Sequence, residues 1–320
     1  MTGTEFPPLI VIGGPTAAGK TQIAIELARR FPVRLISADS VQVYRGMDIG
    51  AAKPDPETLA RWPHALIDIR DPEQVYTMAE FVADAGREIA AAHRAGRMPV
   101  LVGGTPMYLR ALRFGIDPLP GADPKLRARL EREAQSQGWA ALHARLQRLD
   151  PDMARRIRPE DPQRILRALE LCELTGQPAS RLHTGPGPDR MRRGLHLVIC
   201  PPDRAELHRR IGQRWSVMLE SGFLDEVRRL LARPGVHPEL PALRAVGYRQ
   251  AVQVLLGHHP AGWLETAGAA ATRQLAKRQL TAFRQWPAGL WYDPLNRDAI
   301  VRIINRVERI IEARTSMSAC

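Results

Sequence analysis

Apolar runs alternate with amphipathic segments along the first third of the chain. Residues 9–12, 33–37 and 98–102 are short, largely apolar runs of the kind that forms buried strands. Residues 21–30 and 79–94 place apolar side chains three and four positions apart, which is typical of helices packed on a core. Strands that alternate with helices predict a parallel sheet covered by helices, which is the α/β class.

The pattern changes near residue 116. Residues 123–182 contain only helical patterns, separated by proline and glycine, and residues 184–188 (TGPGP) have the composition of a loop. Strand-like runs return at residues 195–200 and Leu290–Tyr292. We therefore expect an α/β core of residues 1–115 and 195–320, interrupted by an all-helical insertion of residues 116–194.

The composition excludes several classes of protein. Of the 320 residues, 44% are hydrophobic and 25% are charged, which are ordinary values for a globular chain. No apolar run approaches the ~20 residues that cross a bilayer, and residues 1–8 lack the features of a secretory signal. The three cysteines, Cys172, Cys200 and Cys320, are far apart and have no metal-site spacing. We expect a cytoplasmic protein with no membrane partner.

The net charge is the informative number in the composition. Lys and Arg number 46 against 34 Asp and Glu, which gives a net charge of +12. Residues 1–115 carry 13 basic and 12 acidic side chains, residues 116–194 carry 15 and 11, and residues 195–320 carry 18 and 11. The excess therefore lies beyond the first third. It favours an anionic partner, with nucleic acid the first candidate, although a diffuse solvated surface accounts for the count equally well.

Residues 14–21 match the phosphate-binding pattern G-x-x-x-x-G-K-[ST] between a predicted strand and a predicted helix, the context that the motif needs. Glycines let the backbone approach a phosphate while successive N–H groups point at it. Lys20 adds a positive charge, and the Thr21 hydroxyl can hold Mg²⁺. The motif predicts a P-loop NTPase-like core that binds a diphosphate or triphosphate. Its members are Gly14, Pro15, Thr16, Ala17, Ala18, Gly19, Lys20 and Thr21.

A carboxylate that P-loop kinases and NTPases use is missing from its usual place. Such enzymes hold Mg²⁺ through an acidic residue at the end of an apolar strand. Here the run 98–102 ends in Gly103, Gly104 and Thr105, while Asp39 follows the run 33–37. Asp39 has three interpretations at this point: a magnesium ligand, a general base or a turn residue.

Several blocks of the sequence resemble the bacterial tRNA dimethylallyltransferases, and together they span nearly the whole chain. The first is the P-loop, and the second, residues 36–54, reads ISADSVQVYRGMDIGAAKP. The others are HALIDIRDP at 64–72, VGGTPMY at 102–108, DPQRILRALE at 161–170, RAVGYRQ at 244–250 and TRQLAKRQ at 272–279. Two positions depart from the family pattern: Ala18 stands where serine is usual, and Pro106 where glycine or another small residue is usual.

The resemblance implies a prenyl transfer to RNA. A dimethylallyl group would pass from dimethylallyl diphosphate to N6 of adenosine 37, beside the anticodon of tRNAs that read codons beginning with U, and diphosphate would leave. The P-loop would then bind a prenyl diphosphate rather than an NTP to be hydrolysed, which accounts for the missing carboxylate. The expected cofactor is Mg²⁺. The adenosine must leave its stack to reach a buried diphosphate. The family also implies a monomer.

The resemblance assigns roles to individual residues as well. Asp39 matches the general base, Thr105 and Arg127 match positions at the substrate end of the active site, and the P-loop matches the diphosphate contacts. Stabilising the departing diphosphate would be the largest catalytic effect. The segments that match tRNA contacts comprise Asp39, Ser40, Val41, Gln42, Gln163, Arg164, Ile165, Leu166, Arg167, Arg244, Ala245, Val246, Gly247, Tyr248, Arg249, Arg273 and Lys277.

Two clusters of basic residues each have more than one interpretation. Arg273, Lys277 and Arg284 fall within roughly 40° of one another on a helix, which makes either a basic stripe or an ordinary solvated face. Arg164 and Arg167 share a helix face, where they would contact tRNA or pair with the neighbouring carboxylates of the same segment.

Two other classes of function stay open on the sequence. A P-loop kinase for a small metabolite would consume ATP and release a phosphorylated product, and a non-catalytic tRNA-binding protein would keep a nucleotide site for structure only. The basic excess and the missing carboxylate weigh against the kinase. Among the aromatic residues, Tyr44 and Tyr108 are the candidates for stacking on a base, and the others are expected in the core.

Overall fold

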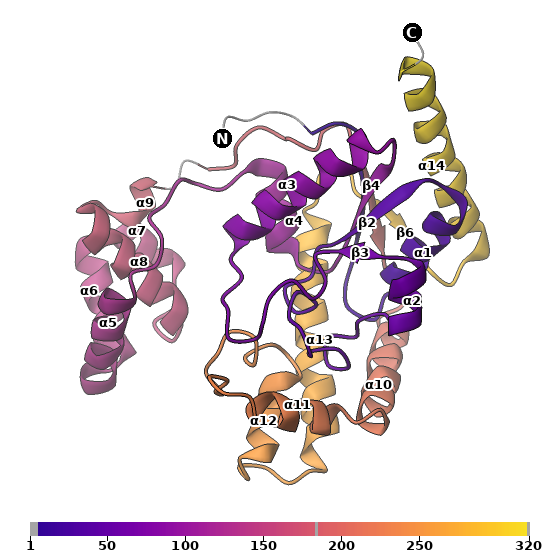
Figure 1. Ribbon diagram of the computed structural model, residues 1–320. Helices are drawn as coiled ribbons and strands as arrows, with labels where there is room; N and C mark the ends of the chain where they lie inside the picture. Colours follow the sequence, from indigo (N-terminus) through magenta and orange to yellow (C-terminus); the bar gives the residue numbers. More distant parts are fainter. Residues whose placement is uncertain (1–5, 183–184, 319–320) are drawn as a thin grey trace. The chain divides into compact units, whose positions relative to one another are not determined.

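A six-stranded parallel sheet carries the fold (Figure 1). The computed structural model describes residues 6–182 and 185–318. The strand order is β3-β2-β4-β1-β5-β6, and every neighbouring pair is parallel. The α/β prediction is therefore confirmed. The strands are β1 (Ile10–Gly13), β2 (Val33–Ser37), β3 (His64–Ala65), β4 (Met98–Val102), β5 (Leu195–Ile199) and β6 (Leu290–Tyr292).

Helices cover both faces of the sheet, because successive residues of each strand point to opposite sides. They are α1 (Lys20–Arg30), α2 (Pro56–Arg61), α3 (Met78–Arg94), α4 (Pro106–Phe114), α10 (Arg204–Glu220), α11 (Phe223–Leu231), α12 (Tyr248–Leu255), α13 (Trp263–Arg284) and α14 (Arg297–Ser318). On one face, Ile10 and Ile12 of β1 share an apolar cluster with α1 and α14. On the other face, Val11 shares a cluster with α3, α4 and α13. Each of these buried strand side chains contributes roughly 1.5–3 kcal/mol of hydrophobic stabilisation.

Helices α10 and α13 pack closely through a glycine. A Cβ atom on Gly268 of α13 would lie 2.3 Å from the indole ring of Trp215 of α10, so a larger residue does not fit without movement. The Trp215 Nε1 donates a hydrogen bond of 3.0 Å to the Thr272 hydroxyl, which satisfies the polar end of a fully buried ring. This contact fixes α13, whose C-terminal half reaches the phosphate loop.

The described chain divides into two compact units, Met1–Arg113 with Asp189–Cys320, and Phe114–Pro188. The helices of the smaller unit are α5 (Pro124–Gln137), α6 (Trp139–Leu149), α7 (Pro151–Arg156), α8 (Pro162–Thr175) and α9 (Ala179–Leu182). Three of them begin with the same Asp-Pro pair, in which Asp123, Asp150 or Asp161 caps free N–H groups and proline occupies the first turn. Leu130, Leu146 and other apolar residues form a core of this unit's own.

The smaller unit ends six residues earlier than the predicted insertion. The chain rejoins the larger unit at Asp189, whose carboxylate pairs with the buried guanidinium of Arg113 at 2.6 Å. Met191, two residues later, is fully buried in the larger unit. The predicted loop 184–188 is irregular from residue 185 onward, and Thr184 lies outside the described residues. Across the described chain, no helix has both the length and the apolar character needed to span a membrane.

Candidate active site

The phosphate loop connects β1 to α1 through a backbone that needs glycine. Gly14 has φ 143°, and a Cβ atom there would lie 2.2 Å from the carbonyl oxygen of Ile199, so the loop passes close to the end of β5. Gly19 has φ 87° and immediately precedes the first turn of α1. The Lys20 ammonium donates to the Pro15 carbonyl at 2.7 Å, which folds its side chain back over the loop. The loop thus presents backbone N–H groups at a helix N-terminus, the arrangement that binds phosphate.

A cavity of about 300 Å³ lies against this loop. Residues from distant parts of the larger unit complete its wall: Asp39, Gln42, Ala51, Ala52, Pro54, His64, Val102, Gly103, Gly104, Arg214 and Gln279. The volume suits a small ligand such as a prenyl diphosphate. Since β1, β2 and β4 all end here, the cavity sits at the carboxyl edge of the sheet, where α/β proteins bind their ligands.

Arg214 and Gln279 contact the phosphate loop, and sequence reasoning did not single out either residue. An Nη1 of Arg214 on α10 donates to the Thr16 hydroxyl at 3.3 Å. The Gln279 side chain on α13 accepts from the Thr16 N–H at 2.9 Å and donates to the Gly104 carbonyl at 2.6 Å. One weak signal existed for Gln279, because it ends the block 272–279, but Arg214 lies in no motif. Both act on the loop from about 200 residues or more away along the chain.

The cavity carries two cations whose charge is poorly solvated. Burial lowers the pKa of Lys20 from 10.5 to about 8; the Asp39 carboxylate opposes this shift, and the Arg214 charge adds to it. Burial also lowers the pKa of Arg214. Neither Lys20 nor Arg214 forms an ion pair with a carboxylate among the described residues. A bound anion would compensate both charges, so the electrostatics suit a diphosphate.

Asp39 follows β2 with one carboxylate oxygen engaged and the other free. Its Oδ1 accepts from the N–H groups of Val41 at 2.9 Å and Gln42 at 3.3 Å, so the turn interpretation is correct for this oxygen. The Oδ2 has no hydrogen-bond partner among the described residues, and Asp39 lines the cavity. Beside it, the Thr105 hydroxyl accepts from the Ser40 N–H at 3.1 Å. A fixed carboxylate with one open oxygen is the geometry of a general base.

The donor set near the loop suits Mg²⁺ only in company with a ligand. Oxygen donors are present in the Thr21 hydroxyl and the free oxygen of Asp39. No group of three or more His, Cys, Asp or Glu residues able to hold a metal occurs in the part of the chain that the structure describes. Mg²⁺ retains several water molecules and binds through substrate phosphates, so these residues fit a metal that arrives with a diphosphate. His64, which also lines the cavity, has a buried Nε2 atom without a hydrogen-bond partner within the described chain.

Comparison with known proteins gives this site a family. The family model described as IPP transferase matches residues 42–286. A tRNA dimethylallyltransferase from Bordetella petrii is 52% identical over 314 residues, covering 95% of this chain and 98% of that protein. A second, from Thioalkalivibrio sulfidiphilus, is 52% identical over 282 residues, covering 88% of each. The chain belongs to the IPP transferase family.

Solved structures of the IPP transferase family share the fold. A full-length tRNA isopentenylpyrophosphate transferase from Bacillus halodurans matches with a TM-score of 0.69 and 34% identity, over 98% of this chain and 99% of that one. A eukaryotic dimethylallyltransferase studied while acting on tRNA matches with a TM-score of 0.72 and 26% identity, over 89% of this chain and 73% of that one. The predicted P-loop NTPase-like core is confirmed by these likenesses.

Arg127, predicted at the substrate end of the active site, lies on α5, within the smaller unit. It forms a two-point ion pair with Glu170 of α8, at 2.8 and 2.9 Å. Glu170 is fully buried and also accepts from Arg167 at 2.6 Å and from the Asp123 N–H at 2.9 Å. These contacts give Arg127 a structural role inside the unit, and its role toward a substrate stays a prediction.

The segment 163–167 of the IPP transferase has mixed exposure. Gln163 and Arg164 are exposed, while Ile165 is fully buried in the core of the smaller unit and its side chain is inaccessible to RNA. Arg164 pairs with Asp161 at 3.5 Å, and Arg167 pairs with Glu170. The interpretation that Arg164 and Arg167 pair with neighbouring carboxylates is therefore correct. Contact with tRNA remains a prediction for the exposed members.

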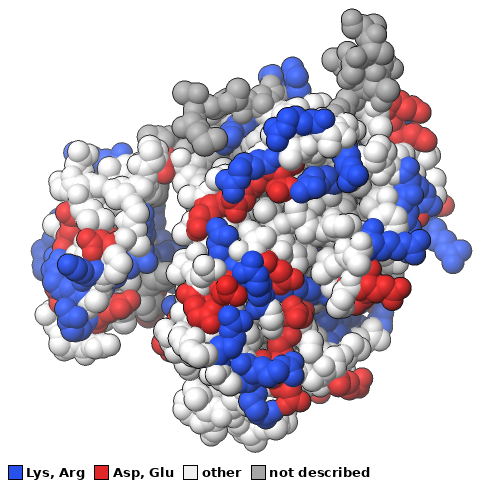
Figure 2. Space-filling model, in the orientation of Figure 1, with Lys and Arg blue, Asp and Glu red and all other residues white. Residues whose placement is uncertain are grey.

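The two later tRNA-matching segments differ from the first. In 244–249, Arg244 and Arg249 are exposed, but Tyr248 is fully buried and serves the interior. On α13, Lys277 is exposed and Arg273 half-buried, and neither forms an ion pair among the described residues. The α13 stripe therefore keeps its charge available to an anionic partner. On the face of the larger unit seen in Figure 2, basic side chains lie among acidic ones, so the net charge alone does not mark an interface there.

The prediction that Tyr44 and Tyr108 stack on a base is wrong. Tyr44 is 4% exposed and Tyr108 is 6% exposed, which leaves no ring face open to a base. Tyr108 instead stacks on Phe81 with ring centres 4.3 Å apart, and burial raises its pKa. Both rings belong to the same apolar cluster as residues of α3, α4 and the sheet, so they serve the core.

Proposed function

We propose that this protein transfers a dimethylallyl group from dimethylallyl diphosphate to N6 of adenosine 37 in tRNA, forming N6-(dimethylallyl)adenosine and diphosphate. One observation carries the proposal most strongly: the free oxygen of Asp39 faces a cavity whose other side is a phosphate loop with two uncompensated cations. The names of relatives about 50% identical to this chain support the same activity. The fit of a base, an anion site and a small cavity is what prenyl transfer from a diphosphate requires.

The diphosphate is bound and then stabilised as it leaves. Backbone N–H groups of Ala17, Gly19 and Lys20 and the Lys20 ammonium would hold its oxygens, and Arg214 would approach from α10. Mg²⁺, held by the diphosphate and the Thr21 hydroxyl, would supply further positive charge at the leaving group. These charges are in place before reaction, so negative charge that develops on the departing oxygen meets them without reorganisation.

Asp39 acts on the nucleophile. As the C1–O bond of the prenyl diphosphate breaks and the C1–N6 bond forms, the N6 amino group must lose one proton, which the free Oδ2 of Asp39 accepts. The hydrogen bonds from Val41 and Gln42 hold Oδ1 and orient the carboxylate. Thr105 braces the same turn through Ser40, so we propose a positioning role for its hydroxyl.

A small-metabolite kinase is not favoured, because the structure leaves no room for the carboxylate that it would need. A Cβ atom on Gly103, at the end of β4, would lie 2.1 Å from the Ala38 carbonyl oxygen. Any side chain at this position would therefore force β2 and β4 apart.

The remaining assignments complete the proposal. The helices of the smaller unit and the stripe of Arg273 and Lys277 would contact tRNA, alongside exposed Arg244 and Arg249. We propose that the enzyme works as a monomer in the cytoplasm. The RNA must present adenosine 37 flipped out of its stack, because the cavity lies at the base of the phosphate loop.

A transfer assay with an altered base tests the proposal. Protein, Mg²⁺, tRNA and labelled dimethylallyl diphosphate are incubated without ATP, and label in adenosine 37 is expected. Asp39→Asn keeps an Oδ1 acceptor for the turn but cannot take a proton, so transfer should slow by roughly 10²–10⁴ while tRNA affinity stays within about twofold. If the native protein transfers no label to tRNA, the proposed function is wrong. If Asp39→Asn transfers label at the native rate, Asp39 is not the general base.

A further inference from the structure

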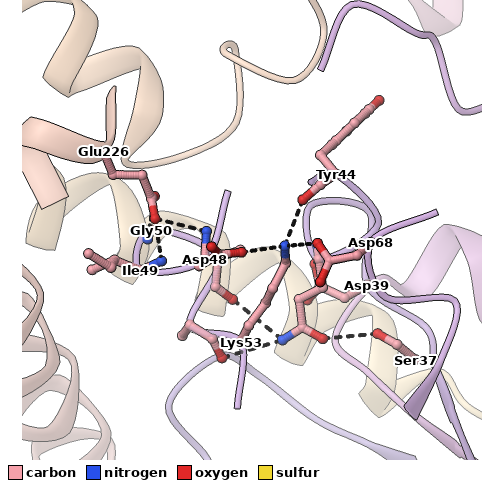
Figure 3. Close-up of polar contacts among 12 residues, drawn as sticks. Ser37, Asp39, Tyr44, Asp48, Ile49, Gly50, Lys53, Asp68 and Glu226 are labelled. Carbon is pink, nitrogen blue, oxygen red and sulfur yellow. Dashed lines mark hydrogen bonds and ion pairs between the residues drawn. The ribbon is translucent and has the colours of Figure 1, made fainter. Parts of the chain in front are cut away.

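Glu226 on α11 is a buried carboxylate that grips the backbone of a distant loop (Figure 3). It is 3% exposed, and its Oε2 accepts from the N–H groups of Asp48 at 2.9 Å and Ile49 at 2.7 Å. Its Oε1 accepts from the Gly50 N–H at 3.1 Å and the Tyr248 hydroxyl at 2.7 Å. All four partners are donors, and no cation pairs with Glu226 among the described residues, so both of its oxygens act only as acceptors.

The gripped loop is held in a conformation that it would not adopt alone. Ala52 has φ 49°, in the left-handed region that costs free energy for a residue with a side chain. A Cβ atom on Gly50 would lie 2.3 Å from the Phe223 ring and 2.5 Å from the Tyr248 ring, so the loop is pressed against α11 and α12. Glu226 thus secures one side of a strained and tightly packed turn.

Lys53 secures the other side of the turn. Its ammonium donates to the Tyr44 carbonyl at 2.6 Å and to the carboxylates of Asp48 at 2.7 Å and Asp68 at 2.5 Å. The Lys53 side chain is only 3% exposed, although both carboxylates reach solvent. Figure 3 shows Asp48 between the two anchors, its N–H bound to Glu226 and its carboxylate bound to Lys53.

This turn leads directly to Asp39. Ala51 and Ala52 line the cavity, and their carbonyl oxygens both accept from the Gln42 side chain at 3.4 Å. The other end of that amide, Gln42 Oε1, accepts from the Ser37 hydroxyl at 3.0 Å. The Gln42 N–H in turn donates to Asp39 Oδ1. Hydrogen bonds at both ends of the turn, connected by the backbone of residues 48–52 and by Gln42, therefore link Glu226 to the carboxylate of Asp39.

We propose that Glu226 is a positioning residue for prenyl transfer, which sets the cavity wall at residues 48–52 and, through Gln42, the orientation of Asp39. The inference rests on the proposed function. It also gives the block 244–249 a second task, because buried Tyr248 orients Glu226 while exposed Arg244 and Arg249 remain at the surface. An error of about 1 Å in a reacting group is enough to slow a reaction up to 10²-fold.

Glu226→Gln tests the proposal. The glutamine NH₂ group is a donor, and it would face N–H or O–H groups that also donate, so part of the hydrogen bonding would be lost. We expect kcat for prenyl transfer to fall about tenfold or more, while KM for dimethylallyl diphosphate and tRNA affinity each change less than about threefold. Asp225→Asn is the matched control: it neutralises the neighbouring, exposed carboxylate of the same helix, which pairs with Arg228 on that helix, and kcat should not change. Rates are measured well below the melting temperature of each variant.

A double-mutant cycle separates positioning from general destabilisation. Gln42→Ala removes the link between the turn and Asp39, so adding Glu226→Gln to it should lower kcat by much less than Glu226→Gln does alone. Additive losses in kcat, or a native kcat in folded Glu226→Gln, would overturn the proposal. If Glu226→Gln does not fold, Tyr248→Phe replaces it in the cycle, since it removes one of the four bonds and should lower kcat by a smaller factor. Absence of transfer by the native protein would instead refute the proposed function.

Discussion

Burial in the folded protein destabilises the charged form of Lys20. Its ammonium lies in the cavity with Arg214 nearby, and burial is the main cause of its low pKa of about 8. A free energy cost is therefore present in the empty site and is recovered when an anion binds. The consequence is a site that is strongly selective for negative charge, because a neutral ligand would leave both cations uncompensated.

The affinity for inorganic diphosphate should fall as pH rises through about 8. Only the protonated form of Lys20 attracts the anion, so above its pKa of about 8 each unit of pH removes up to about tenfold in affinity from the Lys20 contribution. Titration calorimetry between pH 7 and 10 measures the effect, with Lys20→Met as the control because it lacks this titration. The same pH dependence in both proteins would contradict the assignment.

The stability of the ligand-free protein responds to Lys20 in the opposite direction. The folded pKa of about 8 lies below the ordinary lysine pKa of 10.5, so the unfolded chain binds more protons between these two values. Stability contributed by this group therefore increases as pH rises across that window, and the cost of burying its charge is fully present below about 8.

Sequence reasoning at the residue scale found the groups that share a motif. Lys20 and Asp39 stand in short blocks next to predicted strands, so their meeting at one edge of a sheet followed from the order of elements. Arg214 and Glu226 could not be found in this way. They act across 198 and 178 residues, and neither the helical spacing of α10 nor that of α11 indicates which side chain faces a loop near the N-terminus.

At the scale of elements, the strands were predictable and the contacts of helices were not. Residues 33–37, 98–102 and 290–292 form strands with the bounds that their apolar runs indicate. The reason is clearest for residues 98–102, because a strand that is buried on both faces needs an apolar run. The end of the smaller unit differs from the expected residue 194, since an ion pair between Arg113 and Asp189 returns the chain to the larger unit earlier. The ion pair between Arg113 and Asp189 could not be predicted from the composition of the segment.

Two helical glycines on neighbouring helices should respond oppositely to alanine. Gly212 of α10 has open space around its Cβ direction, so Gly212→Ala gains helix propensity and should stabilise the protein by up to about 1 kcal/mol. Gly268 of α13 faces Trp215 at 2.3 Å, so Gly268→Ala forces the helices apart and should cost about 1–3 kcal/mol. Thermal unfolding followed by circular dichroism measures both. Equal shifts of the same sign would show that the α10–α13 contact is looser than described.

At the scale of the whole molecule, the net charge of +12 misleads unless ion pairs are counted. In the smaller unit, Arg127 and Arg167 share buried Glu170, and Arg129 and Arg145 both pair with Glu133 and Glu173. The sum of charges could locate the basic excess in the later two thirds of the chain, but it could not separate paired from available arginines. That separation depends on packing, which places a carboxylate beside some cations and not beside others.

The dependence of tRNA affinity on salt should come from the unpaired cations. The double variant Arg273→Gln, Lys277→Gln removes two charges from α13, so the slope of log affinity against log salt should become less negative by roughly 1.4–1.8. Arg209→Gln is the control, because Arg209 already forms two hydrogen bonds of 2.7 Å with Glu206. Fluorescence titration of tRNA at several salt concentrations measures each slope. An unchanged slope in the double variant would remove α13 from the RNA interface.

The position of β1 in the sheet has a consequence for how the protein is made. β1 emerges first from the ribosome, yet one of its two neighbours in the sheet is β5, which begins at Leu195. The cavity residues Arg214 and Gln279 follow later still. A nascent chain that has not yet been extended to Gln279 would therefore lack part of the anion site, however well its phosphate loop had formed. Synthesis itself therefore delays ligand capture until both Arg214 and Gln279 have been added to the chain.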